Sequence, residues 1–181
     1  MPTRFSRRQR TSVDKNFILD TNAFIEPKNQ YYGFEICPGY WAALIHQHTL
    51  NRVCSIDRIA DELKRGDDAL KEWVVETAPS TFFKSTDDQA VIDRFQDMVR
   101  WVYNQDQFTP AAKAQFASVA DGWLIAYAAV NNLVVVTHEV YSADIKRAVK
   151  IPNVCVEFDV ECVHTFSMLR TLEERFVRNV E

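Results

Sequence analysis

The chain has 181 residues, a length typical of one domain, and 47% of them are hydrophobic, which suffices for a sizeable core. It contains no run of about 18 apolar residues, so we expect no membrane-spanning helix. The polar, basic N-terminus lacks the apolar centre of a secretory signal. These features argue against a membrane protein and predict a cytoplasmic location.

The net charge of −4 is unevenly distributed. Residues 1–15 carry five basic side chains and one acidic side chain, a charge of +4, which leaves −8 for the rest. We expect residues 1–15 to form a flexible basic arm and residues 16–181 to form a single domain. Such an acidic body attracts phosphates poorly unless some carboxylates bind a cation, which reverses the local charge.

The four cysteines form no Cys-x-x-Cys pair and match no zinc-binding spacing. Cys54 and Cys155 lie within apolar runs that are typical of strands. Buried, reduced thiols are therefore a better interpretation than a disulfide framework.

Short apolar runs alternate with amphipathic segments along the chain. We expect a helix to start at 23–25, a loop at 27–39, and strands at 16–20, 52–56, 133–137 and 154–156. Further helices are expected at 40–50, 57–65, 69–78, 87–103, 118–131, 142–149 and 165–177, of which those at 69–78 and 142–149 are short. The alternation predicts an α/β fold, an open and mostly parallel sheet with helices on both sides.

Two acids stand at the ends of predicted strands. Asp20 ends the first apolar run, and Glu139 follows Val134-Val-Val-Thr137, a run typical of a strand buried on both faces. Ligands of parallel sheets bind at the carboxyl ends of the strands. Asp20 could instead cap the following turn, and Glu139 could simply mark the exit from the sheet.

Two further acids lie on predicted helices. Glu62 flanks the apolar face of the 57–65 helix, whereas Asp61 points nearly opposite. Asp121 opens an almost wholly apolar helix. The plainer interpretations are a solvated Glu62 and, for Asp121, a capping box with Ser118.

Together, the four acids fall at element ends that a parallel sheet would bring to one edge. Clustered carboxylates repel one another unless a cation neutralises them, and oxygen-only sets suit Mg²⁺ or Mn²⁺. Such ions can activate water and stabilise a leaving oxygen in phosphodiester hydrolysis. The pattern therefore indicates a metal-dependent hydrolase.

The same motifs resemble the PIN-domain family of nucleases. Four stretches match in order and approximate spacing: 17–22, 59–63, 120–126 and 134–139. Segments 31–32, 38–41 and 150–155 are similar to a prokaryotic subgroup of uncharacterised function. The resemblance implies a PIN-like three-layer α/β/α sandwich and Mg²⁺- or Mn²⁺-dependent cleavage of RNA, in many members as the toxin of a type II toxin–antitoxin pair.

Carried over residue by residue, the resemblance assigns both catalysis and metal binding to Asp20, Glu62, Asp121 and Glu139. Glu139 departs from the family, in which many members have Asp. Asn22 and Thr137 are expected to support the site. The implied partners are an RNA substrate and a cognate antitoxin.

Three rival functions remain. A catalytically inactive PIN-like scaffold would bind RNA or a protein without cleaving, although all four acids are present. A phosphatase with Asp20 as nucleophile would need a second acid where Asn22 stands. A nucleotide-binding domain would need a glycine-rich phosphate loop, which four glycines do not supply.

The basic arm and an aromatic loop are candidates for holding RNA. The predicted contacts are Lys28, Tyr31, Tyr32 and His138, which offer charge and stacking surfaces. We also expect a homodimer, because Trp41 and the aromatic loop carry more large apolar surface than a small monomer normally exposes. The alternative is that these aromatic residues lie in the monomer's own core.

Overall fold

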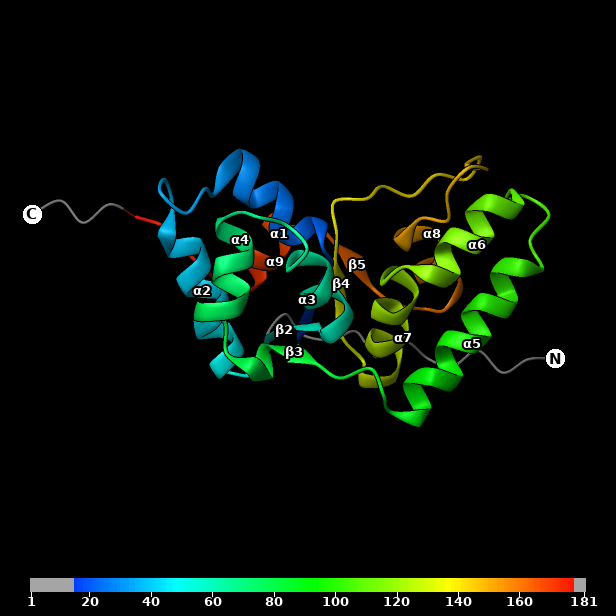
Figure 1. The fold of residues 1–181 in the computed structure, drawn as a ribbon, viewed down its shortest axis with the longest axis horizontal. Coiled ribbons are helices and arrows are strands. Elements are labelled where there is room, and N and C mark those ends of the chain that lie inside the picture. The colour runs from blue at the N-terminus through cyan, green and yellow to red at the C-terminus, as the bar shows by residue number, and fades with distance from the viewer. Residues whose placement is uncertain (1–14, 178–181) are drawn as a thin grey trace, which may run out of the picture.

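The computed structural model describes residues 15–177, and its centre is a sheet of five parallel strands. The strands are β1 (Phe17–Leu19), β2 (Val53–Ile56), β3 (Phe83–Lys84), β4 (Val134–Val136) and β5 (Cys162–Val163), in the order β3-β2-β1-β4-β5. Figure 1 shows the sheet between two groups of helices. The predicted α/β/α sandwich is therefore confirmed, and every strand pair is parallel.

Helices cover both sides of the sheet. On the left in Figure 1 lie α1 (Asn22–Glu26), α2 (Pro38–Thr49), α4 (Ala69–Glu72) and α9 (Thr165–Thr171). On the right lie α5 (Gln89–Tyr103), α6 (Pro110–Ser118), α7 (Asp121–Asn131) and α8 (Ile151–Glu157). Helix α3 (Asp57–Leu63) follows β2. The described residues also form three single-turn helices, η2 (Pro27–Tyr31), η3 (Trp73–Thr77) and η4 (Ser80–Phe82).

The core explains why the apolar runs become central strands. All three residues of β1 and of β4 are buried, and the two strands pair with Phe17 opposite Val134. Branched aliphatic side chains pack well on a sheet covered on both faces. An aromatic cluster fills the space beside α2, where Phe34 stacks on Trp41 and Tyr32 stacks on Tyr40.

The chain reverses its direction of winding between β1 and β4. From β1 it builds β2 and β3 on one side, and then returns to place β4 and β5 on the other. Such a switch point leaves a crevice outside the carboxyl ends of the two strands, where ligands of parallel sheets usually bind. Asp20 and Thr137 directly follow the two strands at this point.

Several predicted segments differ in the structure. The strand expected at 154–156 is part of helix α8, which has Pro152 in its first turn, where proline favours a helix start. The helix expected at 142–149 is an irregular loop. The side chain of Asn153, in α8, holds its start: the amide oxygen accepts the N–H of Ser142, and the amide nitrogen donates to the carbonyl of Ser142. The loop expected at 27–39 contains η2, and the last helix ends at Thr171 rather than at 177.

Four elements of the described residues were not predicted: α6, β3, β5 and the short η4. The two strands have two residues each, which is too short for a recognisable alternation. Thr109 caps helix α6: its hydroxyl accepts the N–H of Ala112, and Pro110 is the first residue of the helix. That N-terminal signal was available in the sequence.

Two other expectations concern the ends of the chain and the membrane. The predicted basic arm lies outside the described residues, except for Lys15, which pairs with Glu161. Among residues 15–177, no helix is both long and apolar enough to cross a bilayer.

Candidate functional site

Asp20 is buried at the end of β1, with only 2% of its surface exposed. Its Oδ2 accepts the hydroxyl of Thr137 at 2.8 Å. Burial raises the pKa of Asp20 to about 6, and the charge of Glu139 adds to the rise, although bonds from Thr137 and from the backbone N–H groups of Thr21 and Asn22 oppose it. The protein thus keeps a carboxyl group in a place that disfavours its charge.

Glu62 faces this edge from the flank of α3, as its helical position predicted. The hydroxyl of Thr21 donates to Glu62 Oε2 at 2.7 Å. The backbone N–H of Ala120, just before α7, makes a longer contact of 3.4 Å to Oε1. The carboxylate of Glu62 therefore links the residue after Asp20 to the residue before Asp121.

Asp121 is the first residue of α7, and the structure contradicts its predicted capping box. Ser118 ends α6 and its hydroxyl bonds the carbonyl of Gln115, while Ala120 precedes α7 without a side-chain cap. A Cβ on Gly122 would lie 2.7 Å from the Phe95 ring, so this glycine allows α7 to approach α5 closely. The start of α7 is held by packing and not by a capping box.

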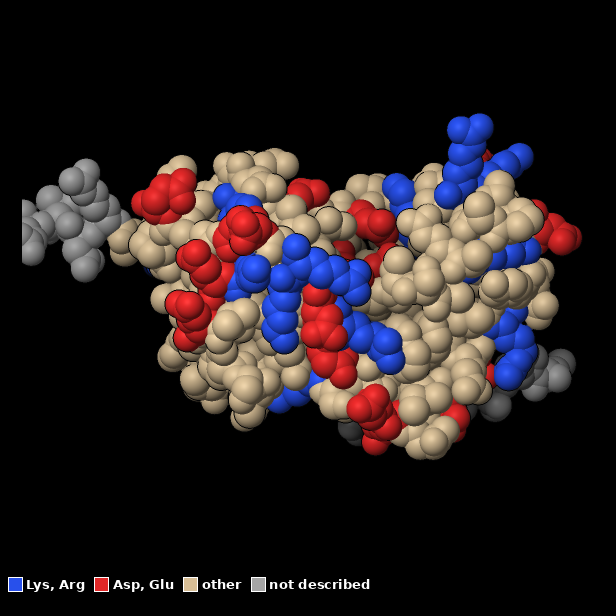
Figure 2. Space-filling view, in the orientation of Figure 1, with Lys and Arg blue, Asp and Glu red and all other residues tan. Residues whose placement is uncertain are grey.

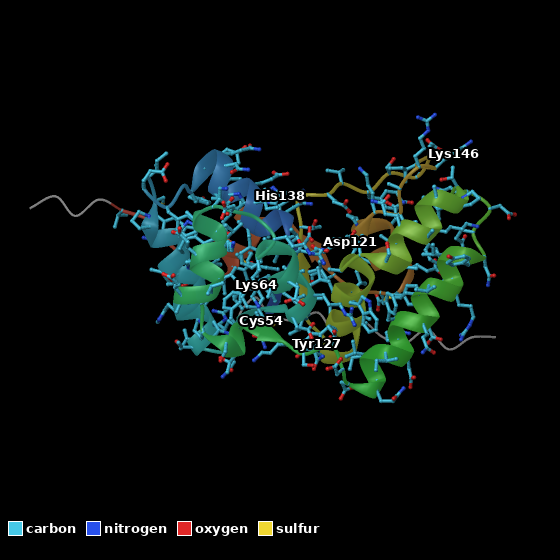
Figure 3. All side chains as sticks on the ribbon, viewed as in Figure 1. Cys54, Lys64, Asp121, Tyr127, His138 and Lys146 are labelled. Atoms are coloured by element: carbon cyan, nitrogen blue, oxygen red, sulfur yellow. The ribbon has the colours of Figure 1, made fainter. Side chains whose placement is uncertain are left out.

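The electrostatic environment of Asp121 shows that the four acids are neighbours. Burial raises the pKa of Asp121 to about 7, and the charges of Asp20, Glu139 and Glu62 contribute in that order. These acids come from four separate parts of the chain, which the sheet brings to one edge. In Figure 3, Asp121 lies between the two helical groups, and Figure 2 shows acidic atoms in a hollow in that region.

Glu139 lies in the loop after β4, near the other three acids but bonded to a different element. Its Oε2 accepts the backbone N–H of Ile151, the first residue of α8, at 2.7 Å. Its own N–H donates to the hydroxyl of Thr137, which also bonds Asp20. The longer side chain of a glutamate thus serves to hold the start of α8, while its second oxygen is left for other contacts.

The donor set fits a hard divalent cation in its chemistry, since it is four carboxylates, and burial together with the charges of neighbouring acids raises the pKa values of Asp20 and Asp121. Within residues 15–177, however, no three His, Cys, Asp or Glu side chains are arranged closely enough to hold an ion without movement. Asp20, Glu62 and Glu139 instead aim oxygens at protein donors. Each carboxylate can accept further bonds, but joint binding of an ion would require these side chains to move.

The predicted supporting residues occupy different positions. Thr137 is buried beside Asp20, as described above. Asn22 begins α1, half-buried, and its backbone N–H bonds Asp20. Thr21, which lies between Asp20 and Asn22 in the sequence and whose hydroxyl donates to Glu62, was not predicted as a site residue. A hydroxyl directly after a strand-ending acid was the available signal.

All four predicted RNA contacts already have partners within the chain. Lys28 pairs with Asp68, and Tyr31 and Tyr32 pack edge-on against Phe166. His138 lies between Glu26, 3.0 Å from Nδ1, and the Thr165 hydroxyl, 2.8 Å from Nε2. Of the four, Tyr31 is the most open, with 51% of its surface exposed.

The reason for expecting a dimer is weakened, because Trp41 is only 3% exposed. Its Nε1–H donates to the carbonyl of Tyr32, and the aromatic loop packs into the monomer's own core. The homodimer itself stays a prediction. All four cysteines are free in the structure; Cys54 and Cys155 are buried, whereas Cys37 and Cys162 are partly exposed, and Cys155 lies on a helix and not on a strand.

Comparison with known proteins gives one match. No curated protein and no solved structure matches the chain. A family model described as "Domain of unknown function (DUF4411)" matches residues 17–176, which include all four acids and every strand. On this evidence the chain belongs to the DUF4411 family.

Proposed function

We propose that the protein is a Mg²⁺- or Mn²⁺-dependent endoribonuclease of the PIN type, with Asp20, Glu62, Asp121 and Glu139 around the metal. The observation that carries the proposal is the raised pKa of Asp121, which the other three acids help to produce. A protein gains nothing in stability from four repelling carboxylates at one edge. A bound cation would remove the repulsion, so cation binding accounts for the clustering of these four acids.

Each residue would have a distinct part in the reaction. A divalent cation supplies charge neutralisation for the phosphate and lowers the pKa of a bound water. Asp20 and Asp121, as the most buried and the most strongly repelled acids, would hold the cation. Thr137 orients Asp20, and Thr21 orients Glu62, through their hydroxyl groups.

The substrate is proposed to be RNA, whose phosphates need positive charge near this acidic edge. Helix α3, which carries Glu62, also carries the exposed side chain of Arg58, and the exposed side chains of Lys64 and Arg65 directly follow its end. Figure 2 shows basic side chains gathered over this part of the molecule beside the hollow, and Figure 3 places Lys64 on the same face as Asp121. Arg58 also lies over the Trp123 ring, 3.9 Å from its centroid.

Helix α3 offers a matched pair of variants for the test. Glu62→Gln removes a candidate metal ligand, whereas Asp61→Asn removes an exposed acid from the next position of the same helix. Cleavage of a fluorescently labelled single-stranded RNA should require Mn²⁺ or Mg²⁺. We expect Glu62→Gln to lower the rate roughly 100-fold or more, and Asp61→Asn to leave it within about twofold.

The same assay addresses the rival function of an inactive scaffold. RNA binding without metal-dependent cleavage would replace the nuclease by a PIN-like RNA-binding module. Equal rates for the two variants, or cleavage that persists in EDTA, would remove these acids from the mechanism. A role as the toxin of a toxin–antitoxin pair stays a prediction, and a small adjacent reading frame for a DNA-binding antitoxin would favour it.

A further inference from the structure

Two of the four cysteines lie together, on elements that meet at one edge of the sheet. Cys162 belongs to the edge strand β5 and stands opposite Val135 of β4. Cys155 lies near the end of α8, and the backbone N–H of Val160 bonds its carbonyl where the chain turns back toward β5. Interaction with the Cys162 side chain is the largest cause of the raised pKa of Cys155, so the two thiols are neighbours.

The two thiols also share a cavity of about 460 Å³. Val156 and Asp159, which line the same cavity, are exposed, so small solutes can reach it from solvent. Cys155 itself is 1% exposed, whereas Cys162 is partly exposed. The pair thus combines an accessible sulfur with a buried one behind it.

The other two cysteines provide a contrast within the same chain. Cys54 is buried in β2, where its thiol lies 3.8 Å from the carbonyl oxygen of Phe17, and burial raises its pKa to about 11. Cys37 precedes α2, on the opposite side of the sheet in Figure 1 from α8. Neither cysteine lines the cavity that Cys155 and Cys162 share.

We propose that Cys155 and Cys162 form a dithiol modification site, which a peroxide converts into an intramolecular disulfide. Cys162, the more accessible sulfur, attacks the peroxide oxygen and becomes a sulfenic acid, with release of water. The sulfur of Cys155 then attacks the sulfur of Cys162, the S–O bond of the sulfenic acid breaks, and the proton of Cys155 passes to the leaving hydroxyl, so that a second water leaves. The thiols lose two electrons and two hydrogens, and the peroxide is reduced to two waters.

The order of the two steps follows from the surroundings of each sulfur. The interaction with Cys162 and then burial raise the pKa of Cys155 well above its usual range, so Cys155 stays protonated and is a poor first nucleophile. Its position next to Cys162 suits it for the second step. The bond would close a short loop, residues 155–162, and tie α8 to β5.

The link would form next to the candidate metal site, although the proposal does not depend on nuclease activity. A second cavity, of about 180 Å³, is lined by Cys162 together with Thr137 and Glu139. Helix α8 also supplies the Ile151 N–H that holds Glu139. A disulfide between α8 and β5 would therefore fix the element that positions the fourth acid.

The test uses a variant that retains only this pair, Cys37→Ser combined with Cys54→Ala. The reduced protein is treated with hydrogen peroxide, quenched with acid, unfolded, and alkylated. We expect the number of free thiols to fall from two to none, a peptide in which Cys155 and Cys162 are joined, and a higher melting temperature. Peptide mapping of the wild-type chain gives the same answer if the variant folds poorly.

Cys162→Ser in the same background is the control, and it should leave Cys155 alkylatable after peroxide. Either of two results would overturn the proposal. One is a Cys162 sulfinic acid beside an unmodified Cys155. The other is a disulfide that joins two chains or, in the wild type, that includes Cys54.

Discussion

Two strands of the sheet are followed directly by an aspartate, and the two aspartates have different surroundings. Asp57, after β2, accepts three bonds: from the N–H of Arg58 at 2.8 Å, and from the N–H and hydroxyl of Thr86 at 3.0 and 2.9 Å. Asp20, after β1, is buried near Glu139 and Asp121, and its pKa is raised to about 6. The two strand-ending acids therefore differ in their surroundings: Asp57 is paired with protein donors, whereas Asp20 lies near other acids.

The surroundings of Asp57 show an acid with a complete structural role. It joins the end of β2 to the segment after β3, and it begins α3, where a negative charge favours the helix. The surroundings of Asp20 show an acid whose charge is unfavourable as the protein stands. This difference yields four predictions, in order of decreasing expected effect.

The largest effect is expected in RNA cleavage. Asp20→Asn should reduce the metal-dependent rate roughly 100-fold or more, because a neutral amide binds a divalent cation poorly. Asp57→Asn retains one acceptor oxygen and should leave the rate within about threefold of the wild type. Single-turnover cleavage of one RNA by both variants tests the contrast. Similar losses in the two would mean that Asp57 also belongs to the site.

The second prediction concerns pH and the metal-free protein. Because the pKa values of Asp20 and Asp121 are raised to about 6 and 7 from 3.8, the folded chain binds protons that the unfolded chain releases. Stability should therefore fall as pH rises from about 4 to about 7, by roughly 2–4 kcal/mol from these groups.

Urea denaturation in EDTA measures this pH dependence. The difference between the wild type and the Asp20→Asn/Asp121→Asn double variant isolates the two groups from all other titrations. We expect the double variant to gain relative stability as pH rises. A difference that is constant between pH 4 and 8 would contradict the raised pKa values.

The third prediction is that substitutions of Asp121 and of Asp57 change the stability of the metal-free protein in opposite directions. Asp121→Asn relieves repulsion and should stabilise the metal-free protein by about 1–2 kcal/mol. Asp57→Ala leaves the Thr86 N–H without its acceptor and should destabilise by about 1–2 kcal/mol. Urea denaturation at pH 7.5 in EDTA gives both values, and a loss of stability in Asp121→Asn would show a structural role.

The smallest effect is expected at Thr21. Thr21→Val keeps the shape but removes the hydroxyl that orients Glu62, and should weaken Mn²⁺ binding about tenfold. Thr49→Val is the matched control, since its hydroxyl bonds only the carbonyl of His46 in its own helix. Equal Mn²⁺ affinities in the two variants would rule out orientation of Glu62 by Thr21.

The sequence was informative where the period of hydrophobic residues was clear. The buried runs of β1 and β4 predicted a parallel sheet, and that topology placed Asp20 and Glu139 at one edge. Helical periodicity separated Glu62 from Asp61, and the structure orients Glu62 toward Thr21 and Ala120. These predictions depended on local patterns that the tertiary structure preserves.

Other features depended on contacts that a single sequence does not encode locally. Val154-Cys-Val156 has strand-forming residues, yet it continues a helix that starts at Ile151-Pro152. Ser118 fitted a capping box but ends α6 instead, and Glu62 supplies the contact at Ala120. The contacts of His138 with Glu26 and Thr165 likewise depend on the tertiary structure, because they join segments that are distant in the sequence.

The central claim is that the four acids together bind a divalent cation. Calorimetric titration of Mn²⁺ into the wild type and into Asp121→Asn at pH 7.5, in two buffers of different ionisation enthalpy, tests it most directly. We expect the wild type to bind Mn²⁺ saturably, with an affinity that rises between pH 6 and 8. Binding should also release protons, because the raised pKa values of Asp20 and Asp121 leave these carboxyl groups partly protonated in the metal-free protein. Absent binding in the wild type, or equal affinity in Asp121→Asn, would contradict it.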